Sequence, residues 1–213
     1  ADEKPITSDR ERLIFSTWVP PIPSTAFDRL ISAEVNALLK RRIPDQASIG
    51  ITMRCPNTCI HCGASDIRGG EPPRPLIESV IDQALDLGTY LISFDGGEPM
   101  MRKDLPQMVA HVDKERAIAT SFTSGYGLSE EMAHALKSAG MYAVRVSLDG
   151  ADATEHDRMR GRGGAFDDAI TGIKNALFAE MLVDMFVVVS PANIDSLDEF
   201  YSLACYVGVH EVS

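Results

Sequence analysis

The stretch SIGITMRCPNTCIHCG, residues 48–63, begins with a short β-rich run and ends in a polar loop that holds three cysteines. The run 48–53 is the first of several after Pro44, and these runs alternate with stretches that have helical periodicity. Such alternation is typical of βαβ units, in which helices join parallel strands. We therefore expect the cysteines to lie just beyond the end of the first strand of a parallel sheet.

The remaining runs extend this pattern to the end of the chain. The other predicted strands are 90–94, 117–123, 142–148, 182–189 and 209–212. The helices predicted between the strands are 76–87, 104–115, 129–139, 165–180 and 196–206. Right-handed crossovers between six parallel strands give either a doubly wound sheet or part of a β/α barrel, and both folds bind ligands at the carboxyl ends of the strands.

The sequence divides at residue 44 into an N-terminal arm with a helix, 1–44, and a core domain, 45–213. Four prolines punctuate residues 1–23, so we expect an extended arm whose Trp18 packs onto the body. A helix is predicted over residues 24–41. No helix follows the last predicted strand to cover its outer face, so we expect the core domain to be truncated at its C-terminal end.

The charge balance bears on possible partners. The chain has 213 residues with 20 Lys and Arg against 31 Asp and Glu, and a net charge of −11. This field repels phosphate backbones and anionic lipids, so neither nucleic acid nor a membrane is the expected partner. No segment approaches the ~20 apolar residues of a membrane span, and the polar start is not a signal peptide. We expect a cytoplasmic protein.

Three of the four cysteines lie close together. Cys55, Cys59 and Cys62 have the spacing C-x3-C-x2-C, whereas Cys205 lies alone in a predicted helix and is expected to be a buried apolar residue. Cysteine thiolates hold iron–sulfur clusters, and three thiolates leave one iron of a four-iron cubane without a protein ligand. An open metal position is a place to do chemistry. The alternative is a structural zinc bound with His61, in a binding module built on a β/α scaffold.

A second motif, FDGGEPMMRKDL at residues 94–105, follows the second strand. Gly96 and Gly97 allow the backbone to approach a ligand closely, and Pro99 stiffens the exit from the turn. Glu98 can accept a hydrogen bond from an ammonium group. The alternative is a tight turn between strand and helix with no ligand.

A third motif, RVSLDGADATEHDRMRG at residues 145–161, follows the fourth strand. Ser147 and Asp149 offer a hydroxyl and a carboxylate to a polyol such as ribose, and Arg160, in the loop that follows, offers two donors to a carboxylate. The alternatives are a simple turn at Asp149 and an Arg160 paired with Asp157 on a solvated face.

Together, the three motifs resemble the radical S-adenosylmethionine (radical SAM) superfamily over residues 48–213. They are most similar to the branch with molybdenum-cofactor, haem-modification and peptide-maturation (SPASM-type) enzymes. The resemblance implies an α/β fold, a partial (β/α)6 TIM-like barrel with parallel strands. It also implies a [4Fe-4S] cluster on Cys55, Cys59 and Cys62 whose open iron binds S-adenosylmethionine. Reductive cleavage would then produce a 5′-deoxyadenosyl radical, which abstracts hydrogen from a peptide or cofactor-precursor substrate.

The resemblance also implies roles for individual residues. Gly97 and Glu98 would face the amino group of S-adenosylmethionine, and Arg160 its carboxylate. His61 would lie near the adenine or only pack in the cluster loop. The full set of implied cofactor contacts is Gly96, Gly97, Glu98, Pro99, Ser147, Asp149, Arg160 and His61. An electron donor such as flavodoxin or ferredoxin is implied as a partner, and a radical methyltransferase is the narrower alternative.

Overall fold

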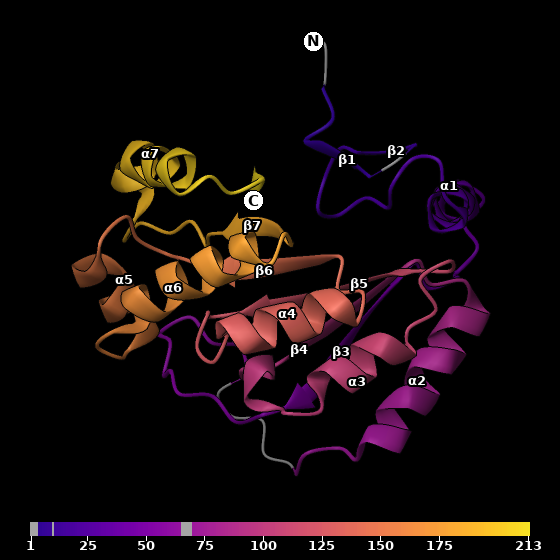
Figure 1. Ribbon diagram of the computed structural model, residues 1–213, viewed down its shortest axis with the longest axis horizontal. Coiled ribbons are helices and arrows are strands. Elements are labelled where there is room, and N and C mark those ends of the chain that lie inside the picture. The colour runs from indigo at the N-terminus through magenta and orange to yellow at the C-terminus, as the bar shows by residue number, and fades with distance from the viewer. Residues whose placement is uncertain (1–3, 10, 65–69) are drawn as a thin grey trace.

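A parallel sheet of six strands organises the molecule. The computed structural model describes residues 4–9, 11–64 and 70–213. Each strand of the sheet pairs with the next one along the chain, in the order β3-β4-β5-β6-β7-β8 (Figure 1). A doubly wound sheet would reverse its order at a switch point, so this order is that of a β/α barrel and confirms the predicted fold class. The strands are β3 (Gln46–Thr52), β4 (Leu91–Gly96), β5 (Ile118–Thr123), β6 (Ala143–Ser147), β7 (Leu182–Phe186) and β8 (Glu211–Val212).

Helices cover the outer face of this sheet. Figure 1 shows α2, α3, α4 and α6 side by side along one face, with the N-terminal hairpin on the other. Alternate strand residues such as Val144 and Val146 point toward these helices and form the main core with them. The glycines Gly88 and Gly208 end α2 and α7 in the left-handed conformation, as predicted. The bounds are α2 (Arg74–Leu87), α3 (Leu105–His111), α4 (Glu130–Ser138), α6 (Ala165–Phe178) and α7 (Leu197–Val207), with short 3-10 turns η1 (Pro99–Met101) and η2 (Ile194–Ser196).

The inner face of the sheet holds a buried ion pair. Arg145 of β6 and Asp184 of β7 are both fully buried, with Nε and Oδ2 3.8 Å apart. The Trp18 ring covers the guanidinium, whose Cζ lies 3.5 Å from the ring centroid, and Trp18 Nε1 donates to Asp184 at 3.2 Å. The backbone N of Thr17 donates to Glu211 of β8 at 2.6 Å. The segment before α1 (Thr25–Leu38) therefore fills the inside of the curled sheet.

The N-terminal region is more ordered than an extended arm. Strands β1 (Thr7–Asp9) and β2 (Arg12–Ile14) form an antiparallel hairpin, so the expectation of an extended arm is wrong for this part. Strands of three residues are too short to show a periodic pattern, and the prolines cluster after them. The predicted packing of Trp18 onto the body is confirmed. The domain boundary at residue 44 stays a prediction.

Helix α5 (Ala153–Arg160) is a second difference from the sequence prediction, which placed Arg160 in a loop. Asp152 caps the helix by accepting a hydrogen bond from the backbone N of Glu155 at 2.9 Å, and Gly161 ends it in the left-handed conformation. Its eight residues are mostly polar, so no apolar periodicity marks the helix in the sequence. Arg160 is therefore held on the last turn of a helix.

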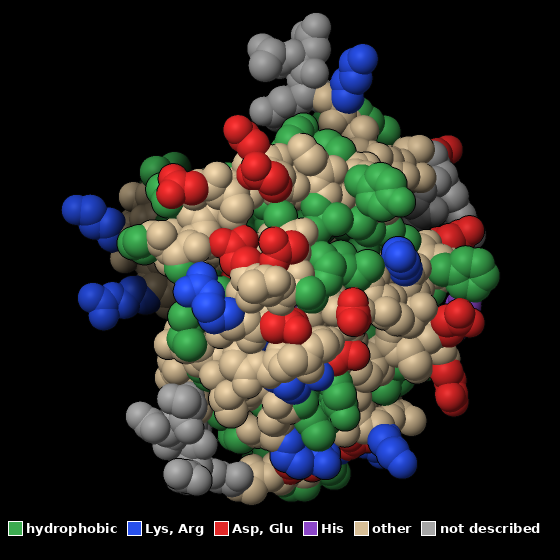
Figure 2. Space-filling view, turned by 90° about the vertical axis from the view of Figure 1, so that its left-hand side faces the viewer, with side chains coloured by type: hydrophobic (Ala, Val, Ile, Leu, Met, Phe, Trp, Pro, Cys, Tyr) green, Lys and Arg blue, Asp and Glu red, His purple; other side chains and the backbone are tan. Residues whose placement is uncertain are grey.

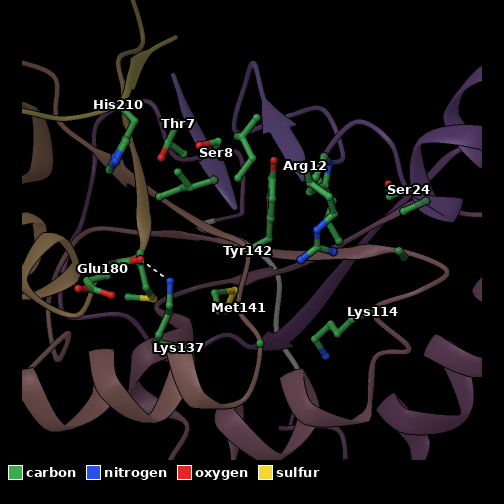
Figure 3. Close-up of a pocket in the computed structure, with 18 of the residues that line it drawn as sticks. Thr7, Ser8, Arg12, Ser24, Lys114, Lys137, Met141, Tyr142, Glu180 and His210 are labelled. Atoms are coloured by element: carbon green, nitrogen blue, oxygen red, sulfur yellow. Dashed lines mark hydrogen bonds between the residues drawn. The ribbon is translucent and has the colours of Figure 1, made fainter. Parts of the chain in front are cut away.

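A cavity of about 780 Å³ lies at the amino ends of the strands, between the hairpin and the starts of β5, β6 and β7 (Figure 3). Two lysines on its wall stabilise helix ends. Lys114 donates to the backbone oxygens of Val109 and Val112 at the end of α3, and Lys137 donates to that of Glu180 beyond α6. A cation at a helix C-terminus offsets the negative end of the helix dipole, so these charges serve the fold.

The outer surface mixes acidic, basic and apolar side chains, as Figure 2 shows for the face on the left-hand side of Figure 1. Tyr201 and Tyr206 of α7 are exposed, and so is Val212 of the edge strand β8. Cys205 of the same helix is also exposed, so the expectation that it is buried is wrong. Among the described helices, none has the length and apolar character that crossing a bilayer requires.

Candidate active site

The three clustered cysteines line one cavity at the carboxyl ends of the strands. Its volume is about 590 Å³, and Gly96, Gly97, Ser147, Arg160 and His61 line it as well. Cys55 and Cys62 are exposed and Cys59 is partly buried, and all three are free thiols. The loop after β3 therefore places three sulfur atoms around a space that solvent can enter.

The last turn of α5 holds this loop in place. The backbone N of Thr58 donates to the carbonyl of Arg160, and that of Ile60 donates to the carbonyl of Met159, both at 3.0 Å. The Thr58 hydroxyl donates to the carbonyl of Gly161 at 3.1 Å. Gly161 has φ +64°, and a Cβ there would lie 2.5 Å from the Thr58 oxygen. Only glycine allows the helix end to approach the loop this closely.

Gly96 and Gly97 allow the end of β4 to approach another backbone segment of the protein, in addition to the ligand cavity that they line. The backbone N of Gly97 donates to the Thr52 carbonyl at 2.7 Å, and that of Glu98 donates to the Arg54 carbonyl at 2.8 Å. A Cβ on Gly96 would lie 2.1 Å from the Thr52 oxygen, and one on Gly97 would lie 2.3 Å from the Arg54 oxygen. The glycines thus join the end of β4 to the start of the loop that follows β3 and holds Cys55, Cys59 and Cys62, called the cysteine loop below.

Glu98 is fully buried, and protein donors surround its carboxylate. Oε1 accepts from the Thr123 hydroxyl at 2.7 Å and from the backbone N of Met100 at 3.1 Å. Oε2 accepts from the backbone N and the hydroxyl of Ser124. Burial raises the pKa of Glu98, and these hydrogen bonds oppose that rise. Pro99 follows as the first residue of η1 and is also buried.

Arg160 contacts both Asp149 and the cysteine loop. Its Nη2 lies 2.9 Å from Asp149 Oδ2, and its Nη1 donates to Cys59 Sγ at 3.7 Å. The Nε2 atom of His61 lies 3.6 Å from the same Asp149 oxygen. Arg160 is only 6% exposed, so the alternative of a solvated pair with Asp157 is wrong.

Asp149 is buried outside the group of residues that line the cavity, whereas Ser147 lies within that group. The Asp149 Oδ1 atom accepts from the backbone N of Val188 at 3.1 Å, and the backbone N of Asp149 donates to His156 Nδ1 at 3.0 Å. Burial lowers the pKa of His156 to about 4. Asp149 therefore anchors Arg160 to the end of β6.

Among the lining residues that sequence reasoning missed are Asp95 and Phe122. Asp95 accepts hydrogen bonds from the hydroxyls of Ser93 and Ser48. Phe122 lies between Trp18 and Phe186, with ring centroids 5.9 Å and 5.0 Å away. Their position near the carboxyl ends of β4 and β5, on the inner face, is the signal that could have identified them.

The donor set suits an iron–sulfur cluster better than a single metal ion. A cubane takes one thiolate per iron, so its cysteines surround a volume and do not converge on a point. Among the described residues, no three His, Cys, Asp or Glu side chains are close enough to hold one ion together, as a structural zinc requires. The three thiols around one cavity therefore fit the cluster.

Known proteins are similar to this chain in sequence. The family model of the radical SAM superfamily matches residues 49–204. The chain is 35% identical over 156 residues to the Fe-coproporphyrin III synthase of Methanosarcina barkeri, covering 72% of this chain and 39% of that protein. It is 30% identical over 181 residues to the PqqA peptide cyclase of Methylocella silvestris, covering 84% of this chain and 48% of that protein. The chain thus spans less than half the length of these relatives.

A solved structure shares the fold at low sequence identity. Streptococcus suis SuiB bound to the precursor peptide SuiA superposes with a TM-score of 0.71 at 18% identity. The match covers 86% of this chain and 42% of SuiB. Because the identity is low, this likeness concerns the barrel and its orientation of strands and helices.

Proposed function

The chain belongs to the radical SAM superfamily, and from this we propose that it is the core of an enzyme that modifies a peptide or a cofactor precursor. In this family, a [4Fe-4S] cluster supplies the electron that cleaves S-adenosylmethionine to methionine and a 5′-deoxyadenosyl radical, which takes hydrogen from the substrate. The observation that carries the proposal is the set of three thiols around one cavity at the carboxyl ends of the strands.

We assign the cluster to Cys55, Cys59 and Cys62, and the cofactor contacts to the residues that share their cavity. Gly96, Gly97, Ser147 and His61 line it. Arg160 lines the same cavity with a permanent positive charge, so we assign it to the carboxylate of S-adenosylmethionine. In this proposal Glu98, Pro99 and Asp149 act by holding these neighbours in place.

The relatives support two substrate classes. One is named a peptide cyclase and another a coproporphyrin synthase, and the solved relative holds a precursor peptide. The proposed substrate is accordingly a peptide or a cofactor precursor of similar size. A one-electron protein such as flavodoxin or ferredoxin would supply the electron, and the exposed thiols suit a reducing compartment such as the cytoplasm.

Anaerobic reconstitution tests the proposal. Purified chain treated with iron and sulfide should turn brown and hold about four irons. With dithionite and S-adenosylmethionine it should release 5′-deoxyadenosine, and the Cys59→Ser variant should release none. A colourless protein with one zinc per chain, or an iron-loaded protein that leaves S-adenosylmethionine intact, would overturn the proposal.

A further inference from the structure

We propose that Arg160 raises the reduction potential of the cluster by donating a hydrogen bond to the thiolate of Cys59. The inference rests on the proposed function in that it takes Cys59 as a cluster ligand. It goes further because it gives Arg160 a role that does not require bound S-adenosylmethionine.

The contact joins a guanidinium and a sulfur atom that are both held in place. Arg160 Nη1 lies 3.7 Å from Cys59 Sγ, a normal length for a hydrogen bond to the large sulfur atom. The ion pair with Asp149, at 2.9 Å, orients the other end of the guanidinium, and the backbone N of Val188 orients Asp149. Arg160 is almost completely buried and Cys59 is partly buried, so the contact is only partly open to water.

The backbone of the cysteine loop is fixed on both sides of Cys59. Thr58 and Ile60 each donate to a carbonyl on the last turn of α5, the turn that also carries the Arg160 side chain. The distance between guanidinium and sulfur is therefore set by two elements that are bonded to each other. Within the described part of the chain, no comparable side-chain donor reaches Cys55 or Cys62.

Electrostatics gives the direction of the effect. Reduction adds one electron to the cluster and so increases the negative charge on its sulfur ligands. A cation with an N–H directed at a ligand sulfur stabilises the reduced form more than the oxidised form. Arginine keeps its charge at every physiological pH, so the stabilisation is permanent. Removal of Arg160 should make the cluster harder to reduce.

The test is a potentiometric titration of the reconstituted full chain with dithionite, followed by electron paramagnetic resonance and performed without S-adenosylmethionine. In Arg160→Gln, the ratio of reduced to oxidised cluster at a fixed potential should fall about tenfold, a midpoint shift of about 59 mV for a one-electron couple. Arg162→Gln is the matched control: it loses a charge from the same segment, but its side chain contacts Asn57 and Asp168, not a cysteine.

Two further variants keep the result interpretable. Arg160→Lys retains a positive charge and should shift the potential less than Arg160→Gln. It replaces Arg160→Gln in the titration if that variant does not bind the cluster. Asp149→Asn removes the negative charge that lies 2.9 Å from the same guanidinium and leaves the cation beside Cys59, so it should not lower the potential as Arg160→Gln does. Iron content and the signal of the wild-type cluster test the proposed function separately. If the iron-loaded Arg160 variants titrate like the wild type, or Arg162→Gln shifts as much as Arg160→Gln, this inference is wrong while the proposed function stands.

Discussion

Ser124 donates two hydrogen bonds to the carboxylate of Glu98, one from its backbone N at 2.8 Å and one from its hydroxyl at 2.6 Å. Glu98 follows the end of β4 and Ser124 follows the end of β5. The pair therefore joins two neighbouring strands at the rim of the cavity, where Ser124 is itself one of the lining residues. Glu98, which is expected from the sequence to contact a ligand, is buried and links β4 to β5.

Glu98→Gln should lower the free energy of unfolding by roughly 1–3 kcal/mol, because the amide NH₂ would face donors and leave one of them unsatisfied. Ser124→Ala, which keeps the backbone donor and loses only the hydroxyl, should cost less. Urea unfolding of the chain without cluster measures both. Equal stability of Glu98→Gln and the wild type would contradict the hydrogen bonds described for this carboxylate.

Gly161→Ala should destabilise the protein and lower its iron content after reconstitution. The new Cβ would lie 2.5 Å from the Thr58 oxygen at a residue with φ +64°. A strained backbone of this kind costs on the order of 1–3 kcal/mol. Gly163→Ala is the control two residues away, because a Cβ there meets nothing within 4 Å. The two variants should differ clearly in thermal unfolding, and equal melting temperatures would show that the helix end does not clamp the loop.

Cys55→Ser, Cys59→Ser and Cys62→Ser should each abolish stable cluster binding, because two thiolates do not retain a cubane that already has one open iron. Cys205→Ser should keep full iron content, since that thiol lies exposed on α7. Iron and sulfide analysis after reconstitution measures this. Iron loss from the Cys205 variant would mean that the ligand set is wrongly assigned.

Protonation of His156 in the unfolded chain should lower the free energy of unfolding in mild acid. Its pKa is lowered to about 4 in the folded protein, from the ordinary value of 6.5, because the ring is buried. Between these values the unfolded chain binds a proton that the folded chain does not, so stability is complete above pH 6.5 and falls as the pH is lowered toward 4. The loss is roughly 3 kcal/mol.

The measurement compares urea unfolding of the wild type and of His156→Asn from pH 7 to pH 4. The asparagine oxygen can still accept from the backbone N of Asp149 but does not titrate. The difference in stability between the two proteins should therefore shrink as the pH falls, and a constant difference would show that His156 protonates equally well in the folded protein.

Asp184→Asn should lower the free energy of unfolding by about 3–5 kcal/mol, because it leaves the buried charge of Arg145 without its counter-charge. Asp198→Asn on the exposed first turn of α7 is the control and should stay within about 0.5 kcal/mol of the wild type. Chemical unfolding compares them. A loss below 1 kcal/mol in Asp184→Asn would indicate that Arg145 gains access to water.

The sequence predicted the regular parts of the barrel because its strands and helices carry strong local signals. All six strands of the sheet and five of its connecting helices were expected, and αL glycines such as Gly88 mark where helices end. The cysteine spacing located the candidate site for the same reason, since all three residues lie in one loop. Helix α5 was missed because only three of its residues are buried.

The remaining details depend on which residues meet across strands, and such contacts leave no local pattern. Two partners of Glu98, Thr123 and Ser124, come from the end of β5. Phe94 and Ser121 are paired across β4 and β5, so the residues just beyond the two strand ends lie side by side. In the same way, only the docking of α5 on the cysteine loop places Arg160 beside Cys59. No spacing of residues within either motif could have predicted these pairs.

The hydrogen bonds from Ser16 and Thr17 to Glu211 join residues 195 and 194 positions apart in the chain. During translation at about 5–20 residues per second, roughly 10–40 seconds pass between the synthesis of the two partners. During this time the nascent segment that carries Trp18 lacks its contacts with Glu211, while the intervening strands and helices can already form. Insertion of this segment and pairing of β8 are therefore expected to occur together in one late folding step. Until then the N-terminal segment is accessible to chaperones.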